Sequence, residues 1–276
     1  MTGVSVPAGE HLSFDLPVGR LSAAQQWWVL TVRGLTQVLR NGEFLFAFLS
    51  PAMFAVCFFV PLRKVMDTLG VDYAQFLMPI IMLQSMSFVA SSAAMRSSLD
   101  GHFGVSERFR VMPMPALVPA SARMVTNLVL LGVALVCGLI ACVLLGWRPS
   151  AVDQGGGGWS GALLAVVIVG AVGLVLAAVA DAIGLVSSSP AMTSQVLYFP
   201  TLILGMLSNG FVPTERFPEW IRGFVRNQPI SQFVASIRLA QDGALTWHAF
   251  WPSLCWLAGL LVLAGVLFTI AVRRGR

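Results

Sequence analysis

The sequence predicts an all-α polytopic membrane protein with six transmembrane helices, an N-terminal interfacial helix and a short extracellular re-entrant helix pair before the last span. The first supporting observation is composition, because 57% of the residues are hydrophobic and only 11% are charged. The second is that uncharged apolar runs longer than about 18 residues recur, which is the length that a spanning helix requires. The third is physical, since a helix satisfies its own backbone hydrogen bonds in lipid.

The apolar runs define a membrane domain over residues 44–272. Pro79 is expected to kink the second span. Trp147 and Trp159 flank a glycine-rich turn and mark one membrane–water interface. The six expected spans cover residues 44–62, 73–95, 120–146, 161–187, 190–212 and 249–272.

The N-terminal segment precedes these spans in two parts. Residues 1–20 are expected to form a flexible cytoplasmic tail, because they contain Glu10 and Asp15 and no apolar core of a signal peptide. Residues 21–43 carry a helical stripe with Trp28 on one face and arginines on another. Such a helix is too polar to span and suits the membrane interface. Packing of this helix on a soluble partner is the alternative.

Charge distribution sets the expected orientation. Six spans place both termini on one side, and that side carries ten of the seventeen lysines and arginines, in the N-terminal segment, the 96–123 loop and the 273–276 tail. By the positive-inside rule these parts are cytoplasmic, in a multi-pass protein of the plasma membrane. The net charge of +5 then indicates topology and contact with lipid headgroups, and no nucleic-acid partner is expected.

The loop over residues 96–119 contains the segment SERFRVMPMP. Glu107 and Arg110 are spaced to pair on a short helix, and Pro113 and Pro115 would stop that helix. Two interpretations follow equally from these residues. The segment is either a rigid lever that contacts a cytoplasmic partner or a solvated loop that carries positive-inside charge.

Residues 213–243, between the last two spans, contain two short amphipathic pieces separated by Pro229. Each piece has about ten residues with internal charges, so neither can span. The regular apolar spacing favours a pair of short helices that re-enter or lie on the outer leaflet. An ordinary extracellular loop is the alternative.

The sequence contains no motif for a catalytic or metal site in the membrane. His11, His102 and His248 lie outside the spans, and HExxH, GxSxG and CxxC do not occur. GxxxxGK[ST] does not occur either, so the chain is not expected to bind ATP in the P-loop manner. The chain is therefore predicted to have no enzymatic activity and no cofactor of its own.

Asp181 is the one acidic residue well inside a predicted span. Because a charge in lipid is costly, its carboxylate is expected to face the bundle interior. Two interpretations account for an acidic residue at this position. Asp181 either makes an interhelical hydrogen bond near the cytoplasmic end of the fourth span or takes part in a proton-linked transport step. No histidine or arginine partner within the spans is expected.

The N-terminal helix, the six spans, the ERFRVMPMP element and the FPEWI…FVRNQPISQFVASIR stretch together resemble permeases of bacterial ABC exporters of the second type. More narrowly, residues 20–275 resemble the B-type permeases of the daunorubicin-resistance group (DrrB-like), which include mycobacterial exporters of phthiocerol dimycocerosate lipids. The most specific match runs from Phe217 to Arg238. Relatives carry a Glu-rich stretch before the loop glycine, where this chain has only Asp100.

The resemblance implies partners and roles. A separate DrrA-like ATPase subunit would hold ATP and Mg²⁺, and a DrrC-like chain would be the second permease. The coupling loop would contact the ATPase, and the 213–243 hairpin would face outside. The residues concerned are Asp100, Phe103, Glu107, Arg108, Phe109 and Arg110 for coupling, and Phe217, Trp220, Asn227, Gln228 and Pro229 for the hairpin.

The expected function is outward movement of a hydrophobic cargo, either a polyketide-type lipid or a daunorubicin-like drug. Adaptable apolar side chains on the second and fifth spans are the candidate route. They are Met82, Met86, Phe88, Phe199, Met206 and Phe211. A proton-coupled transporter that uses Asp181 and a non-transporting membrane scaffold are the alternatives.

Overall fold

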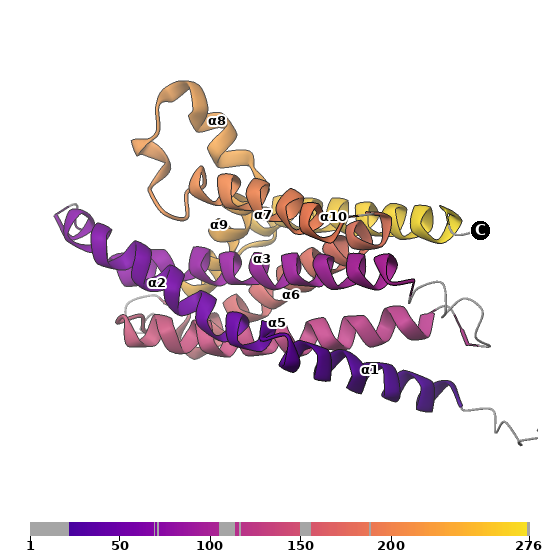
Figure 1. Cartoon of the computed structure of the whole chain (residues 1–276). Helices are drawn as coiled ribbons and strands as arrows, with labels where there is room; N and C mark the ends of the chain where they lie inside the picture. The colour runs from indigo at the N-terminus through magenta and orange to yellow at the C-terminus, as the bar shows by residue number, and fades with distance from the viewer. Residues whose placement is uncertain are drawn as a thin grey trace, which may run out of the picture.

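The computed structural model describes residues 22–104, 114–149 and 156–274, apart from residues 69, 71, 116 and 188. Every regular element in this part of the chain is a helix, in agreement with the predicted all-α class (Figure 1). The elements are α1 Ala23–Arg40, α2 Glu43–Asp67, α3 Tyr73–His102, α5 Leu117–Leu144, α6 Gly158–Val186, α7 Pro190–Met206, η2 Thr214–Arg216, α8 Glu219–Asn227, α9 Pro229–Gln241 and α10 Trp247–Arg274.

Five of the described helices are long and apolar enough to cross a membrane, namely α2, α3, α5, α6 and residues Trp247–Ala271 of α10. The predicted fifth span, residues 190–212, corresponds to α7, which has 17 residues and is not among these five. At a rise of 1.5 Å per residue α7 is about 26 Å long, slightly less than the hydrocarbon core. It ends before a turn in which the Ser208 hydroxyl donates to the Gly205 carbonyl and accepts from the Gly210 N–H.

Helix α3 occupies the centre of the bundle and contacts α2, α5, α6, α7 and α9. Buried apolar side chains such as Met78, Met82, Leu130 and Val169 form the core around it. Helix α10 packs on α6 and α9 and leaves most of its apolar surface outside the core. An exposed apolar helix surface of this kind is expected where lipid, and not water, is the solvent.

Local sequence explains where these helices begin and how the central one accommodates polar residues. Asp72 starts α3, because its carboxylate accepts hydrogen bonds from the N–H groups of Ala74 and Gln75. Gly42, with φ of +73°, separates α1 from α2. Within α3, the hydroxyls of Ser85, Ser87 and Ser91 donate to carbonyls four residues earlier, so they need no partner in lipid.

The helix ends separate into two groups at opposite ends of the bundle (Figure 1). The start of α1, the end of α10, the end of α3 and the start of α5 lie at one end, which we call the terminal end. The turns between α2 and α3 and between α5 and α6 lie at the other end, as does α8, which we call the far end. The first and last described helices therefore begin and end, respectively, at the same end of the bundle.

Candidate functional site

Helix α3 extends further toward the terminal end than the sequence indicated. The second span was predicted to stop near residue 95, but α3 continues to His102 and is 30 residues, or about 45 Å, long. The predicted span was too short because Arg96 and Asp100 form ion pairs with neighbouring helices, so charged residues can continue the helix beyond the apolar run. Of the predicted coupling residues, Asp100 lies in the last turn and Phe103 caps the helix, while Glu107, Arg108, Phe109 and Arg110 lie outside the described residues.

Arg96 connects α3 to α2 and α5. Its guanidinium forms an ion pair with the Glu43 carboxylate at the start of α2. The same guanidinium donates to Oδ1 of Asn127 on α5 over 2.6 Å and to the Ser92 hydroxyl over 3.3 Å. Arg96 is buried away from water. The Glu43 carboxylate neutralises its charge, and the hydrogen bonds to Asn127 and Ser92 replace those that water would supply.

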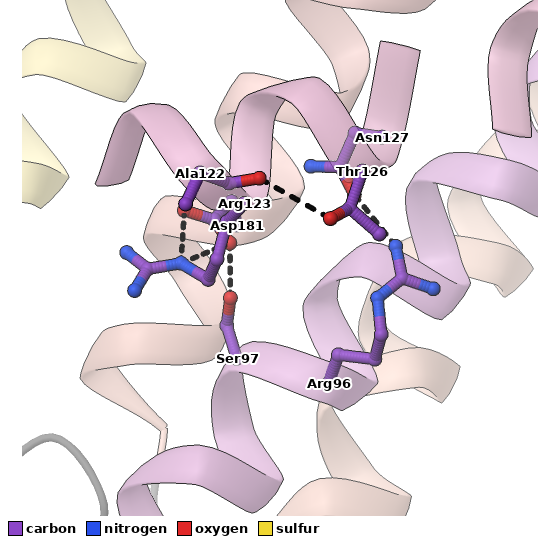
Figure 2. Close-up of polar contacts among 7 residues, drawn as sticks. All are labelled: Arg96, Ser97, Ala122, Arg123, Thr126, Asn127 and Asp181. Carbon is purple, nitrogen blue, oxygen red and sulfur yellow. Dashed lines mark hydrogen bonds and ion pairs between the residues drawn. The ribbon is translucent and has the colours of Figure 1, made fainter. Parts of the chain in front are cut away.

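Arg123 and Asp181 connect α5, α6 and α3 (Figure 2). Nε of Arg123 donates to both carboxylate oxygens of Asp181, over 3.0 and 3.2 Å. The buried Ser97 hydroxyl of α3 also donates to this carboxylate. The expected interhelical hydrogen bond of Asp181 is therefore confirmed. The expectation that Asp181 lacks a basic partner is wrong, because Arg123 was counted as a loop residue and lies in the second turn of α5.

A third ion pair joins α3 to α1. Arg33 and Asp100 approach to 3.6 Å, and the Arg33 side chain is 46% exposed, more than any side chain of the Arg96 and Arg123 pairs. Three arginines and three carboxylates thus balance one another at the terminal end, among the described residues. We call this set the end cluster: Arg33, Glu43, Arg96, Ser97, Asp100, Arg123, Asn127 and Asp181.

Close backbone contacts hold the same helices together. A Cβ on Gly184 of α6 would lie 2.3 Å from the Ala94 carbonyl oxygen of α3. A Cβ on Gly34 of α1 would lie 2.6 Å from the Thr126 hydroxyl of α5. Small residues permit such approaches between membrane helices. The end of α3 is therefore fixed to its neighbours by both packing and charge, so a displacement of this end must move the surrounding helices.

At the far end, Arg238 fixes α9 to the bundle. Its guanidinium donates to the carbonyls of Asn209 over 3.0 Å, Phe76 over 2.8 Å and Gly210 over 3.2 Å. The guanidinium carbon lies 3.7 Å from the centre of the Phe76 ring, a cation–π contact. One side chain thereby donates hydrogen bonds to carbonyls in the turn after α7 and in the first turn of α3.

The predicted hairpin contains two helices, α8 and α9, which meet at Gln228 and Pro229. Gln228 donates from its amide to the Leu207 carbonyl over 2.8 Å, and Pro229 occupies the first helical position of α9. Two helices at the predicted place are thus present, with α9 packed on α6. Of the predicted hairpin residues, Gln228 is buried, Phe217 and Pro229 are half-buried, and Trp220 and Asn227 are exposed.

The six predicted route residues do not share one surface within this chain. Met82 and Met86 belong to the core and face Gly138 and Gly173, where their sulfur atoms would lie within 3 Å of an added Cβ. Phe211 is buried against Phe58 with ring centres 4.1 Å apart, and Phe88 is half-buried. Phe199 and Met206 of α7 are 54% and 56% exposed.

Within the described ranges, no group of three or more His, Cys, Asp or Glu side chains is placed to hold a metal ion. The end cluster contains carboxylates paired with arginines, and its one serine hydroxyl, that of Ser97, is buried against the Asp181 carboxylate. Its chemistry is therefore that of ion pairs that position helices. Six members of the end cluster were not predicted as site residues from the sequence: Arg33, Glu43, Arg96, Ser97, Arg123 and Asn127. A polar residue such as Asn127 within an apolar run was the signal for them.

The fold and the end cluster define a helical integral membrane protein whose polar groups connect helices. Residues 25–241 match the family described as ABC-2 type transporter, and the protein belongs to this family.

Relatives of this chain carry corresponding names. The "Doxorubicin resistance ABC transporter permease protein DrrB" of Mycobacterium tuberculosis (strain ATCC 25618 / H37Rv) is 34% identical over 296 aligned positions, which cover 99% of each chain. The "Daunorubicin resistance ABC transporter permease protein DrrB1" of Streptomyces coeruleorubidus is 26% identical over 193 positions, covering 69% of this chain and 65% of the relative. The "Probable doxorubicin resistance ABC transporter permease protein DrrC" of the same Mycobacterium strain is 25% identical over 206 positions, covering 72% of this chain and 69% of that relative. The resemblance to daunorubicin-resistance B-type permeases is confirmed.

Proposed function

We propose that this protein is the six-span permease subunit of an ATP-driven exporter in the plasma membrane. In this proposal α7 makes the remaining crossing, both termini and the 96–119 loop are cytoplasmic, and α8 and α9 form an outer, re-entrant hairpin. The common location of the start of α1 and the end of α10 at one end of the bundle supports this topology (Figure 1). The excess of lysine and arginine on that side supports its orientation.

The observation that carries the proposal is the attachment of the end of α3. This end leads into the predicted coupling segment and is joined to α1, α2, α5 and α6 by the end cluster. A push from a DrrA-like ATPase that binds ATP and Mg²⁺ would therefore act on four neighbouring helices at once. Asp100 and Phe103, with Glu107, Arg108, Phe109 and Arg110, are the proposed ATPase contacts.

The proposed cargo is a hydrophobic drug of the doxorubicin type, because the relatives named above are doxorubicin and daunorubicin resistance permeases. A polyketide-type lipid, such as phthiocerol dimycocerosate, is the second candidate cargo, from the sequence resemblance. The exposed Phe199 and Met206 of α7 would face the route, between this chain and a DrrC-like permease. The buried Met82, Met86 and Phe211 and the half-buried Phe88 would support that surface from within the bundle.

The ion pair of Asp181 argues against the alternative of a proton-coupled transporter. The Asp181 carboxylate accepts from Nε of Arg123 and from the Ser97 hydroxyl, and a proton carrier would have to break these contacts in every transport cycle. The remaining alternative, a non-transporting scaffold, predicts no ATPase partner.

Co-purification tests the proposal. The full chain, expressed with its neighbouring gene products and extracted in mild detergent, should retain an ATPase subunit. Arg108→Glu with Arg110→Glu should abolish that retention while membrane insertion stays intact. Arg148→Glu, a charge reversal after α5 at the far end, is the matched control and should retain the ATPase. The coupling assignment is wrong if the double variant binds the ATPase as well as the wild type does.

A further inference from the structure

A pocket of about 420 Å³ lies at the far end of the bundle, between the end of α2, the start of α3 and the end of α5. Its walls include Phe59 and Arg63 from α2, Asp72 and Tyr73 at the start of α3, and Leu145 after α5. A volume of this size accommodates a drug-sized group. The pocket is separate from the end cluster, which lies at the terminal end of the bundle (Figure 1).

The pocket has an excess of negative charge. Arg63 forms an ion pair with Asp67 over 3.7 Å and lies over the Phe59 ring at 5.4 Å, so these two charges neutralise each other. Asp72 also lines the pocket, and both of its hydrogen bonds to the start of α3 use the same oxygen, Oδ1. Two carboxylates and one guanidinium leave one net negative charge, centred on Asp72.

The apolar part of the wall is preformed. The rings of Phe59 and Tyr73 are stacked, with centres 6.2 Å apart and planes inclined by 12°. Tyr73 is 1% exposed, and its hydroxyl has no hydrogen-bond partner among the described residues. The buried Tyr73 ring therefore holds the Phe59 ring in place and fixes the shape of this wall.

From this combination we propose that the pocket binds the protonated amine of an amphipathic molecule, with Asp72 as the counter-ion and the Phe59–Tyr73 wall against its apolar body. The proposal rests on the proposed export function in one respect, since an amine-bearing cargo leaving at the far end is one source of such a group. The other source is the ethanolamine headgroup of a phospholipid, which presents the same charge. Either molecule would be held at the end opposite to the ATPase contacts.

Doxorubicin, a fluorescent planar compound with one primary amine, is the probe. Its fluorescence is titrated with the purified full chain in detergent, next to its N-acetyl derivative, which has no positive charge. Asp72→Asn removes the carboxylate charge but keeps a side chain that caps a helix equally well, so the fold is preserved. Glu219→Gln removes an acidic charge from exposed α8 and is the matched control.

The expected result is that Asp72→Asn weakens doxorubicin binding about fivefold, the effect of one charge pair near water. The N-acetyl derivative should bind all three proteins equally weakly, and Glu219→Gln should match the wild type. Displacement of the drug by dihexanoyl phosphatidylethanolamine would assign the pocket to lipid amines as well, whereas the absence of displacement would assign it to cargo alone. Equal affinity of the drug and its N-acetyl derivative for the wild type, or equal affinity of the wild type and Asp72→Asn for the drug, would overturn the proposal. This titration needs no ATPase, so its failure is distinguishable from failure of the exporter proposal, which the co-purification measures.

Discussion

Removing one member of the Arg123–Asp181 ion pair should destabilise the bundle more than removing both. The two groups are 3.0 Å apart, and their side chains are only 20% and 11% exposed. Arg123→Met leaves the Asp181 carboxylate with the Ser97 hydroxyl as its donor, and Asp181→Asn leaves a largely buried guanidinium without its counter-ion.

The size of the effect follows from this burial. Breaking a buried ion pair by removing one partner typically costs about 3–5 kcal/mol. The partial exposure of Arg123 places each single variant near the lower limit, about 3 kcal/mol. The double variant leaves no unpaired charge and should lose about 1–2 kcal/mol, so the two mutations should differ from additivity by about 4 kcal/mol.

Equilibrium unfolding of the purified chain in mixed micelles of increasing dodecyl sulfate content, followed by tryptophan fluorescence, measures these free energies. Arg63→Met disrupts the exposed Arg63–Asp67 pair at the far end and is the control, with an expected change below about 0.5 kcal/mol. Additive effects of the two mutations would refute the assigned pairing. Transport by the double variant also separates the hypotheses, because a proton carrier at Asp181 predicts its loss whereas a structural ion pair predicts its retention.

Two further perturbations test the packing of α3 and α9. Gly184→Ala places a methyl group 2.3 Å from the Ala94 carbonyl, so thermal unfolding in detergent should occur at a clearly lower temperature, while Gly259→Ala, with nothing within 4 Å, should leave it unchanged. Equal melting temperatures of the two variants would contradict the close contact of α3 and α6. Arg238→Met removes the donor to three carbonyls and should destabilise the chain by about 2–3 kcal/mol in the micelle assay, with cleavage by added protease concentrated near α8 and α9. Unchanged stability and protease resistance would show that Arg238 does not hold α9.

Much of the fold was accessible from sequence because apolar length and breaker residues determine it locally. The spans that became α2, α5, α6 and α10 were recognised as uncharged runs, and Pro229 marked the division between α8 and α9. The fifth predicted span is a shorter helix than expected. Gly205 and the Ser208–Gly210 turn end α7 although the surrounding residues are apolar.

The site was less accessible because its contacts join residues far apart in the chain. Arg96 and Glu43 are 53 positions apart, and Arg123 and Asp181 are 58 apart. Counting arginines by loop assigned Arg96 and Arg123 to orientation alone. Periodicity within one helix does not show which arginine faces which acid on another helix, so only the packing of α3 against its neighbours could reveal the end cluster.

The central claim is that this chain is the permease of an ATP-driven exporter, and transport into inverted membrane vesicles tests it most directly. Vesicles that contain the chain with its co-expressed ATPase and second permease should accumulate doxorubicin when ATP and Mg²⁺ are added. They should not do so with a hydrolysis-deficient ATPase or with the Arg108→Glu, Arg110→Glu chain. Uptake that needs no ATP and follows an imposed proton gradient would contradict the account.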